Sequence, residues 1–102
     1  MKIKVLPSAN QDLVDGYWFY EKQSPGLGNY FKDTLFSDID SLSISGGIHP
    51  VHFGKYFRLL SKRFPFATYY TIQHGVVCVF AVLDCRRNPA WIRNKLKQKQ
   101  NN

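Results

Sequence analysis

The chain has 102 residues, of which 44% are hydrophobic and 16% aromatic, and it carries a net charge of +7. This length suffices for one domain but not for two, and the hydrophobic content argues against disorder. The longest apolar run, from Val76 to Leu83, has the length of a strand and is far shorter than the ~20 residues of a membrane span. Because the N-terminus lacks the apolar stretch of a signal peptide, we expect a cytoplasmic protein. A single domain is expected over residues 1–102, with a polar tail from about residue 98.

The charges are distributed unevenly along the chain. Five of the seven acidic residues lie between Asp12 and Asp38, and beyond Asp40 only Asp84 is acidic. The basic residues beyond Asp40 are Lys55, Arg58, Lys62, Arg63, Arg86, Arg87, Arg93, Lys95, Lys97 and Lys99. This asymmetry favours an anionic partner, which can be a nucleic acid, an acidic protein or a membrane surface. A basic face with no partner is the alternative.

The N-terminal part predicts a strand followed by a helix. Residues 2–6 alternate polar and apolar side chains, as in a short strand with one solvated face. Ser8 and Gln11 match a capping box, so a helix is expected from there to the Ser-Pro-Gly sequence at 24–26. The aromatic residues expected in the core are Trp18, Phe19, Tyr20 and Phe31.

A second helix from residue 27 has the clearest amphipathic pattern, with apolar residues every three or four positions until the glycines at 46–47. We expect the two helices to form an antiparallel hairpin that packs on one face of a sheet. Residues 48–54 are expected to form a loop. Its His49 and His52 form an H-x-x-H pattern, but no further ligands cluster nearby, so no metal site is expected. Cys78 and Cys85 are expected to be reduced thiols.

The C-terminal half predicts strands and a last helix. Strands are expected at 56–60 and 66–73, and the His74-Gly75 turn joins the second to the long apolar run. A continuous apolar run is typical of a central strand covered on both faces. Asn88-Pro89 then predicts the start of a short basic helix that ends near residue 97. The sequence therefore predicts an α+β domain with a small antiparallel sheet, in the order β-α-α-β-β-β-α.

Several strings, in this order, resemble the RelE/ParE superfamily, the toxins of type II toxin–antitoxin pairs that are often called plasmid stabilisation proteins. The strings are Ser8-Ala9 with Asp12-Leu13, Tyr17-Trp18-Phe19-Tyr20-Glu21, Gly26-Leu27-Gly28 with Phe31, Phe64-Pro65-Phe66-Ala67 with Tyr69-Tyr70, and Val82-Leu83-Asp84-Cys85-Arg86-Arg87-Asn88-Pro89. They cover about residues 3–96, and the last string is the most specific. The resemblance implies growth inhibition by a toxin that a partly disordered, acidic antitoxin holds silent.

The resemblance implies one of two activities. RelE-like members are ribosome-dependent mRNA endonucleases that use basic residues and a tyrosine without a metal, whereas ParE-like members inhibit DNA gyrase. Arg86 matches the nuclease arginine after the last strand, Arg58 is a candidate on an earlier strand, and Arg63 is a nearby substitute. The stretch at 66–70 has no basic residue, however, and Trp91 lies where the nucleases carry a C-terminal tyrosine.

These departures favour a ParE-like protein that inhibits gyrase or a similar target by binding. A metal-independent mRNA interferase and an inactive homologue that serves only as a binding module stay open, so enzymatic activity is not decided. No cofactor and no membrane partner are expected.

Arg86 and Arg87 are the central site candidates because guanidinium groups bind carboxylates and phosphates in a bidentate manner. The alternative is that one of them pairs with Asp84 for structural reasons. The full set expected to bind a partner or an anion is Arg86, Arg87, Arg58, Lys62, Arg63, Lys55 and Trp91. Its expected partners are the antitoxin and either DNA gyrase or the ribosome with its mRNA.

Overall fold

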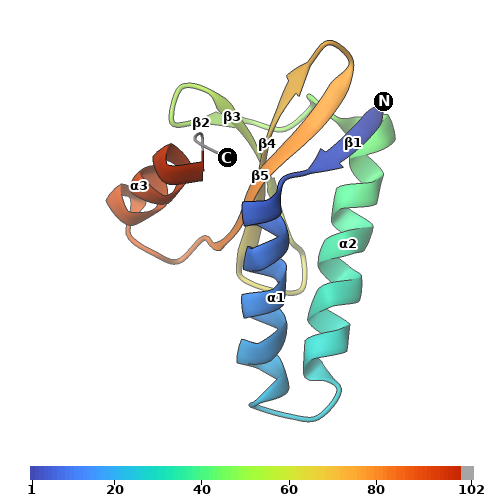
Figure 1. Ribbon diagram of the computed structural model, residues 1–102, viewed down its shortest axis with the longest axis vertical. Helices are drawn as coiled ribbons and strands as arrows, with labels where there is room; N and C mark the ends of the chain where they lie inside the picture. Colours follow the sequence, from blue (N-terminus) through green and yellow to red (C-terminus); the bar gives the residue numbers. More distant parts are fainter. Residues whose placement is uncertain (100–102) are drawn as a thin grey trace.

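The computed structural model describes residues 1–99 and has the predicted α+β architecture (Figure 1). Its elements are β1 (Lys2–Val5), α1 (Pro7–Glu21), α2 (Leu27–Ser45), β2 (Val51–His52), β3 (Tyr56–Leu60), β4 (Phe66–Gln73), β5 (Val76–Asp84) and α3 (Pro89–Lys99). The polar tail predicted from about residue 98 starts inside α3, and residues 100–102 lie outside the described part. No helix of the described residues is long and apolar enough to span a membrane.

The five strands form one sheet in the order β1-β5-β4-β3-β2. The strands after the hairpin pair antiparallel, as predicted, and the sheet is mixed because β1 pairs with β5 in parallel. A parallel pair needs a long connection, and the helical hairpin between β1 and the later strands provides one. The two-residue strand β2, which pairs with β3 through Val51–Phe57 and His52–Tyr56, lies in the segment that was predicted as a loop.

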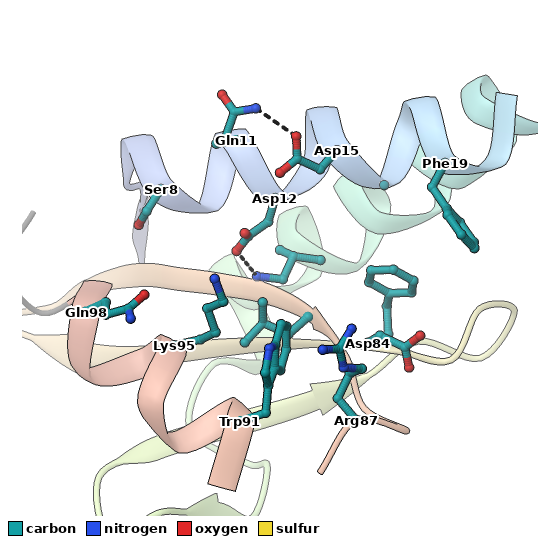
Figure 2. Close-up of a pocket in the computed structure, with 14 residues that line it drawn as sticks. Ser8, Gln11, Asp12, Asp15, Phe19, Asp84, Arg87, Trp91, Lys95 and Gln98 are labelled. Carbon is teal, nitrogen blue, oxygen red and sulfur yellow. Dashed lines mark hydrogen bonds between the residues drawn. The ribbon is translucent and has the colours of Figure 1, made fainter. Parts of the chain in front are cut away.

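The strand β5 extends beyond the end of its neighbour β1, and α1 covers the part of the β5 edge that β1 does not pair with. The parallel pairing stops at Val79, and α1 then passes along the rest of β5 (Figure 2). Ser8 Oγ donates a hydrogen bond to the Phe80 carbonyl at 3.2 Å, and Asp12 Oδ2 accepts one from the Val82 N–H at 2.9 Å. Two side chains of α1 thus satisfy backbone groups that another strand would otherwise pair.

The predicted capping box is not formed. The residue before the first turn of α1 is Leu6, which has no side-chain cap, and Pro7 occupies the start of the helix. Ser8 faces β5 instead, and Gln11 Nε2 donates to Asp15 Oδ1 at 2.8 Å. Proline explains the difference, because it is well tolerated in the first turn and therefore moves the helix start upstream of the serine.

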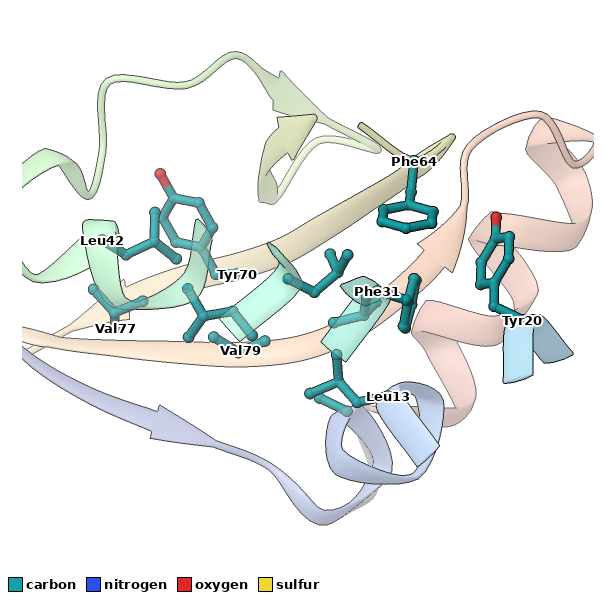
Figure 3. Packing of buried hydrophobic residues seen from close by; sticks show 12 residues of the cluster. Leu13, Tyr20, Phe31, Leu42, Phe64, Tyr70, Val77 and Val79 are labelled. Atoms are coloured by element: carbon teal, nitrogen blue, oxygen red, sulfur yellow. The ribbon is translucent and has the colours of Figure 1, made fainter. Parts of the chain in front are cut away.

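The hairpin of α1 and α2 packs on one face of the sheet, as predicted, and buries the larger core (Figure 3). The stripe of α2 that is buried there consists of Phe31, Leu35, Ile39 and Leu42. Tyr20 and Phe31 lie in this core, but Trp18 and Phe19 remain 54% and 55% exposed, so their prediction as core residues was wrong. Only one stripe of α1 faces the sheet and α2, and it is Ala9, Leu13, Gly16 and Tyr20.

The turn between the two helices is held by one carboxylate. Glu21 accepts hydrogen bonds from the N–H of Gly26 at 3.1 Å and from the N–H of Gly28 at 2.9 Å. A Cβ on Gly28 would lie 2.7 Å from the Tyr17 carbonyl oxygen, so the close approach of the two helices requires glycine there. This explains the Gly-Leu-Gly string in physical terms.

The helix α3 covers the opposite face of the sheet through Ile92 and Leu96, which pack in a second core with Tyr56 and Tyr69. The strand β5 is therefore covered on both faces, as its continuous apolar run predicted. Tyr69 and its neighbour Tyr70 point to opposite faces, as adjacent residues of a strand do.

The register between β4 and β5 contains an irregularity. Tyr69 pairs with Ala81, but Tyr70 pairs with Val79, which leaves Phe80 without a partner in β4. Phe80 and Ala81 consequently both contribute to the α3 side of the sheet. The turn that joins these strands has positive φ angles at His74 and Gly75, 52° and 74°, and confirms the predicted two-residue hairpin.

Candidate partner-binding groove

A groove of about 640 Å³ lies between α1 and α3, above the C-terminal half of β5 (Figure 2). The charged and aromatic side chains that line it come from four elements and the segment after β5. They are Asp12, Asp15 and Phe19 of α1, Phe66 of β4, Asp84 of β5, Arg87 of the following segment, and Trp91 and Lys95 of α3. We refer to this site as the α1/α3 groove.

The wall formed by α3 is basic and aromatic. The guanidinium carbon of Arg87 lies 4.0 Å from the centre of a Trp91 ring, and Lys95 Nζ lies 5.5 Å from it. These distances fit cation–π contacts, and Figure 2 shows Trp91 between the two cations. Asn88 Oδ1 accepts a hydrogen bond from the Ala90 N–H at 2.7 Å, which confirms the predicted cap and fixes the start of the helix. The cap therefore positions the basic wall.

The opposite wall, formed by α1, is acidic. Asp12 contacts the backbone of β5 as described above, and Asp15 is exposed and accepts a hydrogen bond from Gln11. Phe66 and Val82 line the groove between the walls, and Phe19 contributes an exposed aromatic ring. The α1/α3 groove is thus amphipathic, with opposite charges on its two sides.

Arg86 and Arg87, the paired arginines of the sequence prediction, have different surroundings. Arg86 donates from Nε to Asp84 Oδ1 at 3.1 Å and from Nη2 to Oδ2 at 2.8 Å, and its backbone N–H also donates to Oδ1. These hydrogen bonds hold the pKa of Asp84 below its usual value. Arg86 therefore makes the structural ion pair that was the alternative interpretation, while Arg87 lies against Trp91 in the groove.

The other basic candidates do not gather at one point. Arg63 donates to the hydroxyl of Tyr30 on α2 at 2.7 Å, and Lys62 is exposed in the same β3–β4 loop. Arg58 pairs in register with Tyr69, on the face of the sheet that α3 covers. The structure thus places Arg58 and Arg63 on different sides of the sheet.

Lys55 lies near the aromatic residues at the edge of the α3 side. Its Nζ is 5.5 Å from the ring centre of Tyr56 and 5.9 Å from that of Phe80. These contacts place Lys55 outside the α1/α3 groove, whose lining does not include it. Of the seven sequence candidates, only Arg87 and Trp91 line the groove.

Tyr69 is the most buried ionisable residue near Arg58. Burial raises the pKa of its phenol, and the nearby Arg58 guanidinium acts in the opposite direction. On the other face, His49 Nδ1 forms a hydrogen bond with the hydroxyl of Tyr70, and burial lowers the pKa of His49. Within residues 1–99, no three His, Cys, Asp or Glu side chains are arranged to hold a metal ion.

Sequence reasoning missed the acidic wall and Lys95. Lys95 follows Trp91 by one helical turn. Because residues at i and i+4 lie on the same face of a helix, this spacing could have predicted that Lys95 lies beside Trp91. Asp12 and Asp15 carry no such signal, because their closeness to α3 depends on how α1 crosses β5. Phe19 was assigned to the core, and its exposure is visible only in the fold.

A second exposed apolar surface lies on the outer side of the helical hairpin. A depression of about 340 Å³ is lined there by Val14, Tyr17 and Trp18 of α1 and by Lys32 and Phe36 of α2. Val14 and Phe36 are 47% and 37% exposed. This surface and the α1/α3 groove lie on different sides of α1.

The chain matches no family model and no curated protein. Among solved structures, it resembles a chain of a structure described as "Chromosomal ParDE TA system from P. aeruginosa", with a TM-score of 0.72 and 17% sequence identity. The superposition covers 80% of this chain and 92% of that chain. A likeness at this identity establishes the fold. The chain therefore shares its fold with that chain of the ParDE structure, in agreement with the α+β fold expected from the sequence.

Proposed function

We propose that the protein is the toxin of a type II toxin–antitoxin system and that it inhibits its target by binding. The observation that carries the proposal is the ParE/RelE-like toxin fold, shared with a chain of a ParDE system. The target that fits the ParE-like features of the sequence is DNA gyrase or a similar enzyme.

Binding is favoured over RNA cleavage because the candidate catalytic residues are dispersed. Electrostatic catalysis needs preorganised cations aimed at one reacting group. Arg86 is instead paired with Asp84, and Arg63 contacts Tyr30. Tyr69 has a raised pKa, which opposes its action as a general base near neutral pH.

One observation keeps the nuclease as a second candidate. Arg58 lies beside Tyr69 on one face of the sheet, which is the combination of residue types that a metal-free ribonuclease uses. The helix α3 packs on Tyr69, and Arg58 lies on the same face of the sheet. An RNA-cleaving activity would therefore require α3 to move.

An antitoxin is the expected second partner. The chain presents two separate surfaces suited to protein contacts, the α1/α3 groove and the apolar depression on the hairpin. Two surfaces allow a toxin to engage an antitoxin and a target by different sides.

Three assays test the proposal together. Induced expression of the chain is expected to arrest growth, and the purified protein is expected to inhibit gyrase supercoiling at micromolar concentration. Primer extension on mRNA from the same cells is expected to show no new cleavage sites in coding regions. Unimpaired growth would contradict a toxin, whereas new cleavage sites abolished by Arg58→Ala would establish the nuclease instead.

A further inference from the structure

We infer that the α1/α3 groove binds a segment of a partner protein that presents a carboxylate to Arg87 and Lys95 and an apolar side chain to Trp91 and Phe66. The inference rests on the proposed function in taking the occupant to be a protein that regulates or receives a toxin. The segment docks by its side chains and does not add a strand to the sheet.

The two cations of the groove lack a carboxylate of their own. Among the side chains that the structure describes, residues 1–98, neither Arg87 nor Lys95 lies within ion-pair distance of a carboxylate, whereas Arg86 pairs with Asp84. Asp84 is sensitive to the charge of Arg87, but both of its oxygens already accept hydrogen bonds from Arg86. Arg87 and Lys95 therefore keep their donors for a ligand.

The arrangement of these cations suits a carboxylate. They lie 4.0 Å and 5.5 Å from the ring of one indole, so a carboxylate bound beside Trp91 is attracted by both charges. Arginine binds a carboxylate with two parallel hydrogen bonds, and a neighbouring ammonium adds a further charge-assisted contact.

The acidic wall distinguishes a protein segment from a nucleic acid. Asp12, Asp15 and Asp84 line the same groove as the two cations. A phosphate chain would bring successive negative charges past these carboxylates, whereas a segment with one or two acidic residues brings its charge only to the α3 wall. The groove volume of about 640 Å³ lies within the usual range of ligand sites.

The backbone groups at the edge of β5 limit how the segment can dock. A strand that joined this edge would need the Phe80 carbonyl and the Val82 N–H, and these groups are already bonded to Ser8 and Asp12. Strand addition depends on free main-chain groups at a sheet edge. The partner must therefore enter as a helix or a turn between α1 and α3.

The test uses the two tryptophans of the chain. Trp18 lies on the other side of α1, in the hairpin depression, so Trp18→Phe leaves Trp91 as a fluorescent reporter of the groove. Short random peptides displayed on phage are selected on this variant, and the enriched peptides are synthesised and titrated while Trp91 emission is recorded. We expect enrichment of Asp or Glu next to aliphatic or aromatic residues.

The matched variants remove equal charge at different places. Arg87→Gln with Lys95→Gln is expected to weaken the binding of the peptides by roughly tenfold or more, since each lost charged hydrogen bond costs about 1.5–3 kcal/mol. Lys22→Gln with Lys97→Gln removes two charges outside the groove lining and is expected to change affinity less than about twofold. Circular dichroism confirms that both variants are folded. A second groove variant, Arg87→Glu with Lys95→Glu, is expected to select basic peptides instead.

Several results would overturn the inference. These are enrichment of basic or uncharged peptides on the wild-type groove, equal weakening in the two glutamine variants, or Trp91 quenching by random single-stranded RNA that exceeds quenching by the peptides. Growth arrest is scored separately. A chain that binds acidic peptides but never arrests growth contradicts the proposed function alone, whereas a toxic chain whose groove ignores acidic peptides contradicts the inference alone.

Discussion

Replacing Gly16 by alanine should destabilise the protein, although this change normally stabilises a helix. Alanine at an interior helix position gains about 1 kcal/mol over glycine. In this fold, however, a Cβ at Gly16 would lie 2.5 Å from Cε2 and Cζ of Phe31 on α2. Carbon atoms in contact prefer about 3.5–4.0 Å, so one of the helices or the ring must shift by roughly 1 Å.

Phe31 has little room to shift. It is fully buried, and its ring centre lies 4.9–5.2 Å from those of Phe66, Tyr20 and Phe64. Figure 3 shows Phe31 in the core with Tyr20 and Phe64. Overpacking of this kind costs about 1–3 kcal/mol. With a cost near the upper end, about 3 kcal/mol, and a gain of about 1 kcal/mol from helix propensity, the net loss is about 2 kcal/mol, or roughly 10 °C in Tm.

Urea unfolding followed by circular dichroism measures this loss. Asn10→Ala, at an exposed position of the same helix, is the control and should be neutral or slightly stabilising. Phe31→Leu is expected to relieve the clash, so the double variant should cost clearly less than the sum of the two single variants. A stabilising Gly16→Ala, or costs that simply add, would refute the close approach of α1 and α2 at this point.

The remaining predictions concern buried polar groups and pH. The Thr68 hydroxyl is fully buried and has no hydrogen-bond partner among the described residues, so Thr68→Val should raise the free energy of unfolding by about 1 kcal/mol; a loss on urea unfolding would reveal a missing partner. Burial raises the pKa of Asp38, so this group favours folding below about pH 4 and its contribution is lost as the pH rises through its folded pKa. Asp38→Asn should therefore stabilise the protein at neutral pH and lose this advantage in acid, and an equal effect at both pH values would contradict it. The pH dependence from Asp84 has the opposite sign, because Arg86 lowers the pKa of this carboxyl. Its contribution to stability is present above about pH 4 and is lost as the pH falls. The difference in the free energy of unfolding between Asp84→Asn and wild type should therefore shrink in acid.

Local sequence patterns predicted the elements that depend on local signals. Apolar residues every three or four positions from Leu27 to Leu42 predicted a helix with one buried face. The continuous apolar run of β5 predicted a strand buried on both faces. The His74-Gly75 turn and the Asn88 cap follow from the backbone needs of a tight hairpin and a helix start. Each of these features was confirmed.

Features that depend on tertiary packing were not predictable. Trp18 and Phe19 look like core residues in the sequence, because nothing local tells an apolar residue that faces the core from one left on the surface. The extra residue at Phe80 shifts the alternation of β5, and a shift of one residue can be read only from the pairing with β4.

The candidate site was predicted in part. The pattern after β5 pointed to Arg87 and Trp91, which do line the groove, but it treated Arg86 as their equal, and the fold pairs Arg86 with Asp84. The acidic wall comes from α1, and Asp12 lies 70 residues before Val82, the residue of β5 that it contacts. No short-range pattern links segments so far apart.

The most direct test of the central claim is growth after induced expression of the chain, alone and together with a small acidic protein encoded beside its gene, where an antitoxin would be sought. If the chain is a toxin, we expect growth arrest by the chain alone and recovery when this antitoxin is co-expressed. Unimpaired growth, with the folded protein abundant in the cells, would contradict the account.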